Sequence, residues 1–367
     1  MKKLMLFVMI MTFALCCVSF ASATDRVGAD AELIKAAQEE GSLVVFGSCD
    51  EPYLIAACQR FEEIYDIHVD YLRMSTAKVQ TMITEENGKP SGDVWFGGTN
   101  EPYNEAAKQG LLKAYNAKNA IHIIRDEFKD PDGYWYGIYQ GILGFMVNNN
   151  ELSAKNLEMP KTWDDLLKPE YKGLIWMSNP DTAGTARLII NTIIQMKGHD
   201  EGIAYLLDLD KNISKYTQSG ADPSKSVGPG DCVIAIGFLH DGLTQYLNEF
   251  DTIRLIIPED GTSYEIGSTA IFEGCAHPNA AKLWIEYALS PECVELADDA
   301  GSYQYLVLDN AEDPSALAAF PELNRNKTIE YDFTDAKENT TKYVEDYFNA
   351  LKETGVDKEN DDRFEKE

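Results

Sequence analysis

Residues 233–242 read VIAIGFLHDG, an apolar run that ends in an imidazole, a carboxylate and a glycine. An apolar run of this length, bounded by polar and glycine residues, predicts an interior strand of an α/β sheet. Ligands of such sheets bind at the carboxyl ends of the strands. His240 and Asp241 therefore stand where a small molecule would be bound. A strand end with two surface polar residues is the plainer interpretation of the same run.

Upstream of this run, three units of a strand followed by a helix succeed one another. Their strands are predicted at residues 42–46, 68–72 and 93–96. The alternation predicts a parallel, doubly wound sheet. The turns after the strands carry small hydroxyl or glycine residues, which are Ser48, Ser75, Thr76, Gly98 and Thr99. One such turn is only a helix cap, but three at one sheet edge indicate a site for an oxygen-rich ligand.

A second series of strands and helices follows residue 140. Residues 141–148 predict a strand that crosses between two lobes, and residues 253–258 predict the returning strand. Between them, a strand at 173–177 leads through Thr182, Ala183, Gly184 and Thr185 into a helix at 186–197. The free amides and positive dipole end of such a helix can hold an anion, although a capped helix is the plainer interpretation. The segment lacks the GK[ST] of a Walker loop.

The lengths of these segments predict two lobes. A chain of about 340 residues without its leader exceeds the usual size of one domain. We assign residues 24–140 and 262–352 to lobe 1, with C-terminal helices that could pack on either lobe, and residues 141–261 to lobe 2. Residues 353–367 are rich in charge and predict a frayed tail. Ser219 ends a further strand, and Glu265 falls on or next to a hinge strand.

The first 23 residues have the pattern of a secretory signal peptide. Lys2 and Lys3 precede an apolar stretch at residues 4–20, and Ala-Ser-Ala at 21–23 predicts cleavage after Ala23. The sequence thus predicts export to the periplasm. Lipid anchoring at Cys16 or Cys17 is disfavoured because the small residue expected before a modified cysteine is lacking.

The composition of the chain excludes several partners. The chain has 32 basic and 61 acidic residues, and loss of Lys2 and Lys3 leaves 30 and 61, a formal charge of −31. Such a surface repels nucleic acid and anionic lipid and favours a soluble monomer. It still allows an anionic ligand, because backbone amides at helix N-termini bind anions locally.

Five cysteines lie beyond the leader, at positions 49, 58, 232, 275 and 293. An odd number leaves at least one unpaired unless a bond joins two chains. Cys275 with Cys293, or Cys49 with Cys58, could form one disulfide. None has zinc-ligand spacing, so we expect small core residues and no metal site.

Four segments carry a resemblance to a known family. They are residues 44–48 (VVFGS), 160–166 (PKTWDDL), 261–267 (GTSYEIG) and 277–282 (HPNAAK) with Ser-Pro-Glu at 290–292. The chain resembles periplasmic solute-binding proteins of ABC importers, in the branch that holds ferric-ion, aminoethylphosphonate, thiamine and sugar-phosphate binders. The resemblance covers almost the whole chain after the leader. It implies a type II periplasmic-binding-protein fold, with two α/β lobes joined by two crossover strands that close over a ligand, and a permease in the inner membrane as partner.

Within this branch, the opening run distinguishes the ligand classes. Ferric-binding members place adjacent tyrosines where this chain has His240 and Asp241, and no Tyr-Tyr pair occurs here. The chain is more similar to sugar-phosphate binders, which have a His-Asp pair at this point and a glutamate downstream, matched by Glu265. By that resemblance these three side chains would bind sugar hydroxyls. The phosphate would be held by hydroxyl turns and a helix N-terminus, for which the spacing points to Ser48, Ser75, Thr76 and residues 182–185. Ser219 is a further candidate ligand-binding residue.

Two other functions remain open from the sequence. The same fold could bind a phosphonate, another phosphate ester, ferric iron or a metal chelate. An enzyme would use His240, Asp241 or Glu265 as acid and base and Ser48 as nucleophile. The chain has no G-x-S-x-G elbow, metal-ligand cluster or cofactor loop, so we expect a binding protein without cofactor.

Overall fold

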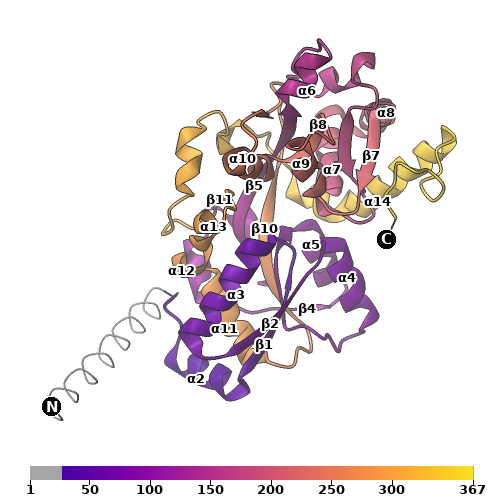
Figure 1. Ribbon diagram of the computed structural model, residues 1–367. Coiled ribbons are helices and arrows are strands. Elements are labelled where there is room, and N and C mark those ends of the chain that lie inside the picture. Colours follow the sequence, from indigo (N-terminus) through magenta and orange to yellow (C-terminus); the bar gives the residue numbers. More distant parts are fainter. Residues whose placement is uncertain (1–26, 367) are drawn as a thin grey trace, which may run out of the picture.

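The computed structural model describes residues 27–366, so the predicted leader lies outside the described residues. The described chain forms two lobes, one above the other, that are joined by long central strands (Figure 1). Within residues 27–366, we find no helix with the length and apolar character needed to cross a membrane.

Lobe 1 is built on three parallel strands and one antiparallel strand. β1 pairs with both β2 and β3 in parallel, and β10 runs antiparallel beside β3. Helices α2, α3 and α11 cover one face, and α4 and α5 cover the other (Figure 1). The strands are β1 (Ser42–Gly47), β2 (His68–Arg73), β3 (Val94–Thr99), β4 (Leu112–Lys113) and β10 (Tyr264–Phe272). The helices are α2 (Ala31–Glu40), α3 (Glu51–Tyr65), α4 (Thr76–Glu85), α5 (Glu101–Lys108), α11 (Pro278–Ala288), α12 (Pro291–Val294) and α13 (Leu296–Asp299).

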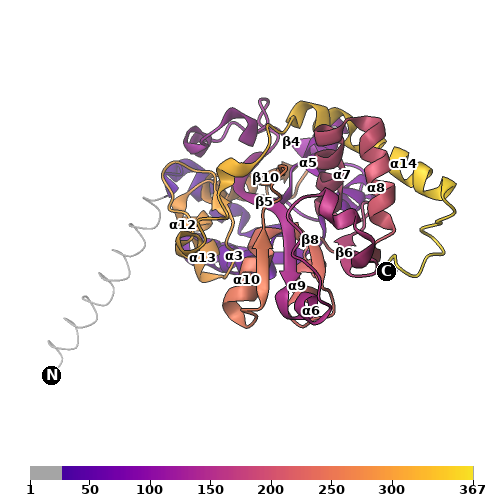
Figure 2. The same cartoon turned by 90° about the horizontal axis from the view of Figure 1, so that it is seen from above.

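Lobe 2 repeats this plan. β6 pairs in parallel with β7 and β8, and β5 runs antiparallel beside β8. Helices α7 and α8 lie on one side of these strands, and α9 and α10 lie on the other (Figure 2). The strands are β5 (Tyr136–Asn148), β6 (Ile175–Ser178), β7 (Ile213–Thr217), β8 (Ile234–Phe238) and β9 (Ile253–Ile256). The helices are α6 (Asn149–Ala154), α7 (Gly184–Lys197), α8 (His199–Asp210), α9 (Asp222–Val227) and α10 (Leu239–Asn248).

The two lobes share strands β5 and β10. β5 is 13 residues long and buried throughout, pairing with β10 in its first half and with β8 and β9 in its second. β10 pairs with β3 of lobe 1 and with β5. The returning strand is therefore β10, and the prediction that residues 253–258 cross between the lobes is wrong. Their first part forms β9 (Ile253–Ile256), which pairs only with the lobe 2 end of β5.

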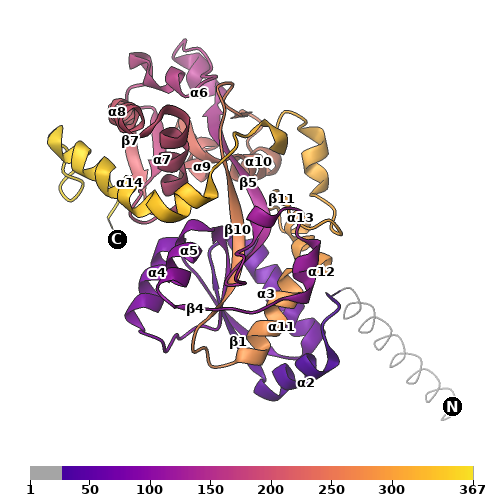
Figure 3. The ribbon, with the colours of Figure 1, turned by 180° about the vertical axis from the view of Figure 1, so that it is seen from behind.

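The C-terminal helix α14 (Phe333–Glu353) spans the junction of the lobes (Figure 3). Asn191 of α7 donates a hydrogen bond to Thr340 on this helix, at 2.7 Å, and Lys337 pairs with Asp130 of lobe 1, at 3.2 Å. This helix thus packs on both lobes. The sequence alone did not indicate on which lobe the C-terminal helices would pack.

The tail after α14 is ordered against lobe 2, so the prediction that it frays is wrong. The Phe364 ring is buried and stacks on Tyr216 of β7, with centroids 4.2 Å apart. Arg363 pairs with Asp210, at 3.1 Å. A single buried aromatic residue anchors the charged segment, because an aromatic ring buries a large apolar area and so contributes much of the packing energy.

The five cysteines of the described residues are all free thiols, so neither possible disulfide is present. Cys49, Cys58, Cys232 and Cys293 are buried, and burial raises the pKa of each. They act as small apolar core residues, as the sequence suggested.

Candidate functional site

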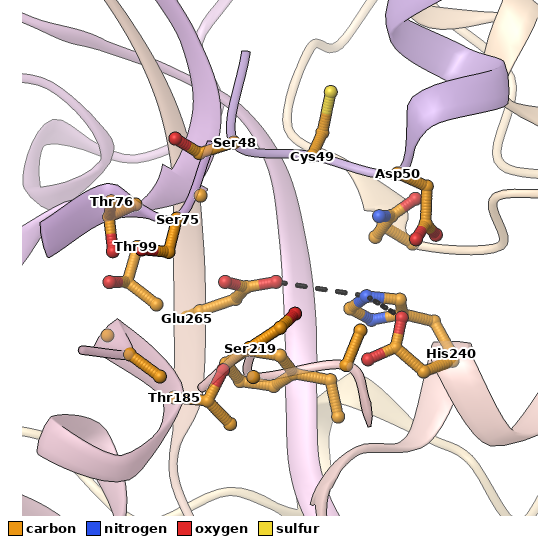
Figure 4. A pocket seen from close by; sticks show the side chains of 18 of the residues that line it. Ser48, Cys49, Asp50, Ser75, Thr76, Thr99, Thr185, Ser219, His240 and Glu265 are labelled. Atoms are coloured by element: carbon orange, nitrogen blue, oxygen red, sulfur yellow. Dashed lines mark ion pairs between the residues drawn. The ribbon is translucent and has the colours of Figure 1, made fainter. Parts of the chain in front are cut away.

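A pocket lies between the lobes, at the carboxyl ends of their parallel strands. It contains about 520 Å³ of empty space, part of it open to solvent. Figure 4 shows hydroxyl side chains gathered on one side of this pocket and His240 on the other, with Glu265 between them. The wall is formed by Ser48, Cys49, Asp50, Arg73, Ser75, Thr76, Gly98, Thr99, Tyr139, Ala183, Gly184, Thr185, Ser219, Gly220, Ala221, Phe238, His240, Asp241, Glu265 and Gln304.

The lobe 1 wall depends on a glycine at the end of β3. Gly98 has φ +79°, and a Cβ at this position would lie 2.3 Å from Thr76 Cγ2 and 2.7 Å from Ser48 Cβ. No larger residue would allow these two hydroxyl turns to approach each other. Trp95 fixes Ser48 by donating from Nε1 to its Oγ, at 2.9 Å. The three turns predicted from the sequence therefore converge.

Helix N-termini from both lobes point at the hydroxyl side of the pocket. In lobe 1, Ser75 caps α4 and Thr76 begins it. In lobe 2, α7 begins at Gly184 with no side-chain cap, two residues earlier than predicted, so Gly184 and Thr185 belong to its first turn. Amides of such first turns have no partner within the helix and carry the positive end of its dipole, so they favour an anion.

The lobes are closed against each other at this point. A Cβ on Gly184 would lie 2.0 Å from Thr99 Oγ1 and 2.9 Å from Thr76 Oγ1. Gly184 belongs to lobe 2 and the two threonines to lobe 1. The N-terminus of α7 therefore packs on the hydroxyl turns of the opposite lobe, and only glycine fits at the contact.

His240 and Asp241 lie in the first turn of α10, not at the end of a strand as predicted, because β8 ends at Phe238. A helical turn can aim two consecutive side chains at one pocket, whereas consecutive strand residues point to opposite faces. Both residues line the pocket. Both side chains therefore face the ligand pocket.

These two side chains form a cluster with Glu265 of β10. His240 Nε2 lies 3.5 Å from Asp241 Oδ1 and 3.9 Å from Glu265 Oε1 (Figure 4). His240 and Asp241 are each 7% exposed and Glu265 is 3% exposed. The imidazole therefore stands between two buried carboxyl groups.

Burial decides the protonation of this cluster. It lowers the pKa of His240 to about 4, against the opposing influence of Asp50. Burial also raises the pKa of Asp241 well above its usual value, and Asp50 raises it further. The pKa of Glu265 is raised by burial first and by Asp241 second. A neutral imidazole between carboxyl groups that resist ionisation can both donate and accept hydrogen bonds, which suits ligand hydroxyls.

Gly141 of β5 makes room for this cluster. A Cβ on Gly141 would lie 2.6 Å from His240 Cε1 and 2.7 Å from Glu265 Oε1. The cluster thus packs directly on the backbone of the hinge strand, and any side chain at position 141 would displace it.

Ten of the eleven residues predicted for the site line the pocket. Thr182 does not, because its hydroxyl donates to the carbonyl of Gln218, at 2.8 Å. The ten are Ser48, Ser75, Thr76, Ala183, Gly184, Thr185, Ser219, His240, Asp241 and Glu265.

Several lining residues were missed. Arg73 is the only basic side chain that the described residues contribute to the wall, and it donates from Nε to the Cys49 carbonyl at 3.3 Å. Arg73 and Asp50 stand at the same strand ends as Ser75 and Ser48, so the strand-end rule could have found them. Gln304 comes from a loop with no motif, and its place depends on tertiary structure alone.

Neither a metal centre nor a nucleophilic triad is formed by the described residues. They contain no cluster of three or more His, Cys, Asp or Glu side chains that could hold a metal ion. Ser48 Oγ is held by an indole N–H rather than by a base. The site is equipped to bind, through hydroxyls, amides and carboxyl groups.

Comparison with known proteins agrees with this chemistry. Residues 98–337 match the family model described as bacterial extracellular solute-binding protein. A curated but uncharacterised protein of Haemophilus influenzae is 34% identical over 86% of this chain and 92% of its own length. The phosphoglycerate transport regulatory protein PgtC of Salmonella typhimurium is 30% identical, but over 49% of this chain and 46% of its own length.

Solved structures extend this likeness to the fold. The periplasmic binding protein AfuA of Actinobacillus pleuropneumoniae, with exogenous fructose-6-phosphate bound, is 32% identical and superposes with a TM-score of 0.80 over 85% of this chain and 99% of that one. Iron-bound HitA of Pseudomonas aeruginosa is 20% identical with a TM-score of 0.71, over 83% of this chain and 99% of that one, and shares the fold. The predicted two-lobe α/β fold is confirmed. The family match spans well over half of the sequence, and the chain belongs to the bacterial extracellular solute-binding proteins, a family of binding proteins rather than enzymes.

Proposed function

We propose that this protein is the periplasmic receptor of an ABC importer for a small phosphorylated sugar, such as a hexose 6-phosphate. One observation carries the proposal: a pocket between the lobes has helix N-termini and hydroxyl groups on one side and His240, Asp241 and Glu265 on the other. The protein would work as a monomer, with residues 24–140 and 262–352 closing on residues 141–261 before delivery to the inner-membrane permease.

The anion-binding side fits a phosphate group. The first turns of α4 and α7 meet there, with Thr76, Thr99 and Thr185 around them (Figure 4). Amides and hydroxyls donate hydrogen bonds to phosphate oxygens, and the helix dipoles add a favourable field. Arg73 is the neighbouring cation on the wall.

The hydroxyl-binding side fits a sugar. The carboxyl groups of Asp241 and Glu265 accept or donate hydrogen bonds according to their protonation, and His240 adds an imidazole. Phe238 stacks parallel to the His240 ring, with centroids 5.5 Å apart and an interplanar angle of 8°, and so restrains its orientation. The similarity to AfuA, which was solved with fructose-6-phosphate, supports this ligand class.

The alternative ligand is another phosphorylated or chelated anion in the same fold. The name of PgtC supports a test of phosphoglycerate. Ferric iron is less favoured, because HitA shares only the fold at 20% identity and the described residues contain no suitable ligand cluster.

A ligand panel tests the proposal by thermal unfolding. Fructose 6-phosphate or glucose 6-phosphate at about 100 times its dissociation constant should stabilise the protein by about 2.7 kcal/mol. Free fructose should give no shift in melting temperature, and 3-phosphoglycerate and ferric citrate test the alternatives. A shift with ferric citrate and none with any phosphosugar would reject the proposal.

Two variants make the test residue-specific. Asp241→Ala removes a hydrogen-bonding group worth about 1.5–3 kcal/mol, so the dissociation constant for the bound phosphosugar should rise about ten- to a hundredfold in titration calorimetry. Thr182→Ala is the control, because Thr182 lies in the same loop as Gly184 but bonds to Gln218. Equal affinities of the two variants would mean that the sugar lies elsewhere.

A further inference from the structure

The hinge strands themselves contribute two polar side chains to the ligand pocket. β10 runs antiparallel beside β5, where Glu265 pairs with Gly141. Two residues further along β10, Gly267 pairs with Tyr139. Side chains two residues apart on a strand point to the same face of a sheet, so these two pairs share one face. Glu265 and Tyr139 both line the pocket, and the shared face is therefore the pocket face.

In each of these pairs a glycine lies opposite a large side chain. A Cβ on Gly141 would stand 2.7 Å from Glu265 Oε1, and a Cβ on Gly267 would stand 2.0 Å from Cε2 and Cζ of Tyr139. The Tyr139 ring thus lies across the backbone of β10, where only glycine leaves room for it. The residue is 3% exposed. The two hinge strands therefore fix the position of this ring by packing.

The Tyr139 hydroxyl reaches the wall of lobe 1. Its oxygen accepts a hydrogen bond from the Gly98 amide, at 2.8 Å. Gly98 is the glycine that lets the turns at Ser48 and Thr76 approach each other. The phenol oxygen therefore lies beside the hydroxyl side of the pocket, where the first turns of α4 and α7 also meet.

The proton of this hydroxyl has no acceptor among residues 27–366. The bond from Gly98 is the hydrogen bond that these residues give Tyr139, and it uses a lone pair of the oxygen. By contrast Tyr136, three residues earlier on β5, accepts from the Ala117 amide and donates to the Tyr115 carbonyl. Burial raises the pKa of Tyr139 well above its ordinary value, so the hydroxyl keeps its proton and remains a donor. A buried donor without an acceptor costs free energy, so this proton needs an acceptor in the pocket.

We propose that Tyr139 is a further ligand-binding residue, whose hydroxyl donates a hydrogen bond to a phosphate oxygen of the bound sugar phosphate. This contact rests on the proposed function, because it requires a phosphorylated ligand. Thr99, the residue after Gly98, supports this place for the phosphate, since its Oγ1 is buried at the pocket wall without a hydrogen-bond partner in the described part of the chain. The Gly98 amide polarises the phenol that accepts its hydrogen bond, which strengthens the donation from Tyr139 to an anion.

Two tyrosine variants form a matched test of this contact. Tyr139→Phe keeps the ring on Gly267 and removes the hydroxyl. Tyr103→Phe is the control, because the Tyr103 hydroxyl is buried in the same lobe but donates to the carbonyls of Gly97 and Ser268, at 2.8 and 2.7 Å, and does not line the pocket. Circular dichroism and thermal unfolding without ligand establish that both variants are folded.

Titration calorimetry with fructose 6-phosphate then separates the two hydroxyls. Loss of a hydrogen bond to a charged group should raise the dissociation constant of Tyr139→Phe about ten- to a hundredfold. The dissociation constant of Tyr103→Phe should stay within about twofold of the wild-type value, because its hydroxyl is already satisfied within the protein. An unchanged affinity of Tyr139→Phe would overturn the proposal. Equal losses in both variants would also overturn it, since the hydroxyls would then act through the packing of lobe 1 and not through the ligand.

A ³¹P spectrum of the bound ligand identifies the group that Tyr139 contacts. At saturating fructose 6-phosphate, the bound phosphorus resonance should shift between the wild type and Tyr139→Phe and should stay in place in Tyr103→Phe. An unshifted resonance in Tyr139→Phe would overturn the assignment to phosphate, even with reduced affinity. Failure of the proposed function is distinguishable, because it appears in the wild type: a wild-type protein that binds no phosphosugar rejects that function and this contact with it.

Discussion

At the scale of single residues, the site contains two buried acids, Asp241 and Glu265, that lower the stability of the folded protein. Asp241 and Glu265 are nearly fully buried, and the group between them is an imidazole whose pKa lies at about 4. A buried carboxyl group without a cationic partner costs free energy when it ionises. Such a cost is common at functional sites, and it supports the proposed role of these residues in ligand binding.

Replacing Glu265 with glutamine should stabilise the ligand-free protein at neutral pH. Burial and Asp241 raise the pKa of Glu265 in the folded state, so the folded protein retains a proton that the unfolded chain releases. As pH rises through this interval, the unfolded state binds fewer protons and the free energy of unfolding falls. Below the ordinary carboxyl pKa of about 4.3 both states are protonated and the difference vanishes.

At pH 8 the free energy of unfolding of the Glu265→Gln variant should exceed that of the wild type by about 1–3 kcal/mol, so the variant should have the higher melting temperature. At pH 4 the two proteins should have the same melting temperature. Thermal unfolding at both values measures this, with the exposed Glu322→Gln as control. Affinity for the ligand should fall in the same variant. A melting temperature below that of the wild type at pH 8 would show that the folded protein stabilises the ionised Glu265 carboxylate instead of penalising it.

At the scale of elements, the contact between α7 and the hydroxyl turns of lobe 1 should control closure. Gly184→Ala places a methyl group 2.0 Å from the position of Thr99 Oγ1 in the closed form. The ligand-free protein should fold normally, because lobe 2 carries α7 away from lobe 1 when the hinge opens. The closed form should be strongly disfavoured, so affinity should fall at least tenfold.

Small-angle scattering distinguishes this effect from unfolding. Saturating ligand should reduce the radius of gyration of the wild type and of Thr182→Ala, which changes the same loop away from the contact. It should leave that of Gly184→Ala unchanged. Full compaction of Gly184→Ala with wild-type affinity would mean that the two lobes do not meet at Gly184.

The elements near the site were largely predictable from the sequence, because local patterns determine them. Strand ends followed by small hydroxyl residues identified Ser48, Ser75 and Thr76, and the apolar run identified β8. Those signals depend on periodicity within about ten residues. The start of α10 was missed, since an apolar Leu239 continues a strand pattern as readily as it begins a helix.

Longer-range features were not predictable in the same way. Whether residues 253–258 or β10 return to lobe 1 depends on which half of β5 each one pairs with, and the sequence of neither segment indicates this. The anchoring of the tail by Phe364 depends on one aromatic contact with Tyr216. Gln304 reaches the pocket from a loop whose position is set by β11 pairing with β5. Tertiary pairing decides each of these, and no local pattern encodes it.

At the scale of the whole molecule, the charge of the protein opposes that of its proposed ligand. The chain has 61 acidic and 32 basic residues, a formal net charge of −29. Asp50 and Arg73 line the pocket together, whereas burial keeps the Asp241 and Glu265 carboxyl groups from ionising readily. An anionic phosphosugar therefore approaches through a repulsive long-range field and is held by short-range donors inside.

This arrangement predicts that salt accelerates binding, opposite to its usual effect on steered association. Raising the ionic strength from about 0.01 M to about 0.15 M shortens the Debye length from about 30 Å to about 8 Å, so the distant carboxylates are screened before the short-range contacts are. The association rate constant of fructose 6-phosphate, measured by stopped flow, should rise severalfold over this range, while the dissociation rate constant changes little. Sucrose of equal osmolarity is the control for non-ionic effects, and Asp50→Asn should raise the rate at low salt and flatten its salt dependence. A rate constant that falls with salt would show that the local field of Arg73 and the helix N-termini extends beyond the pocket and outweighs the net charge.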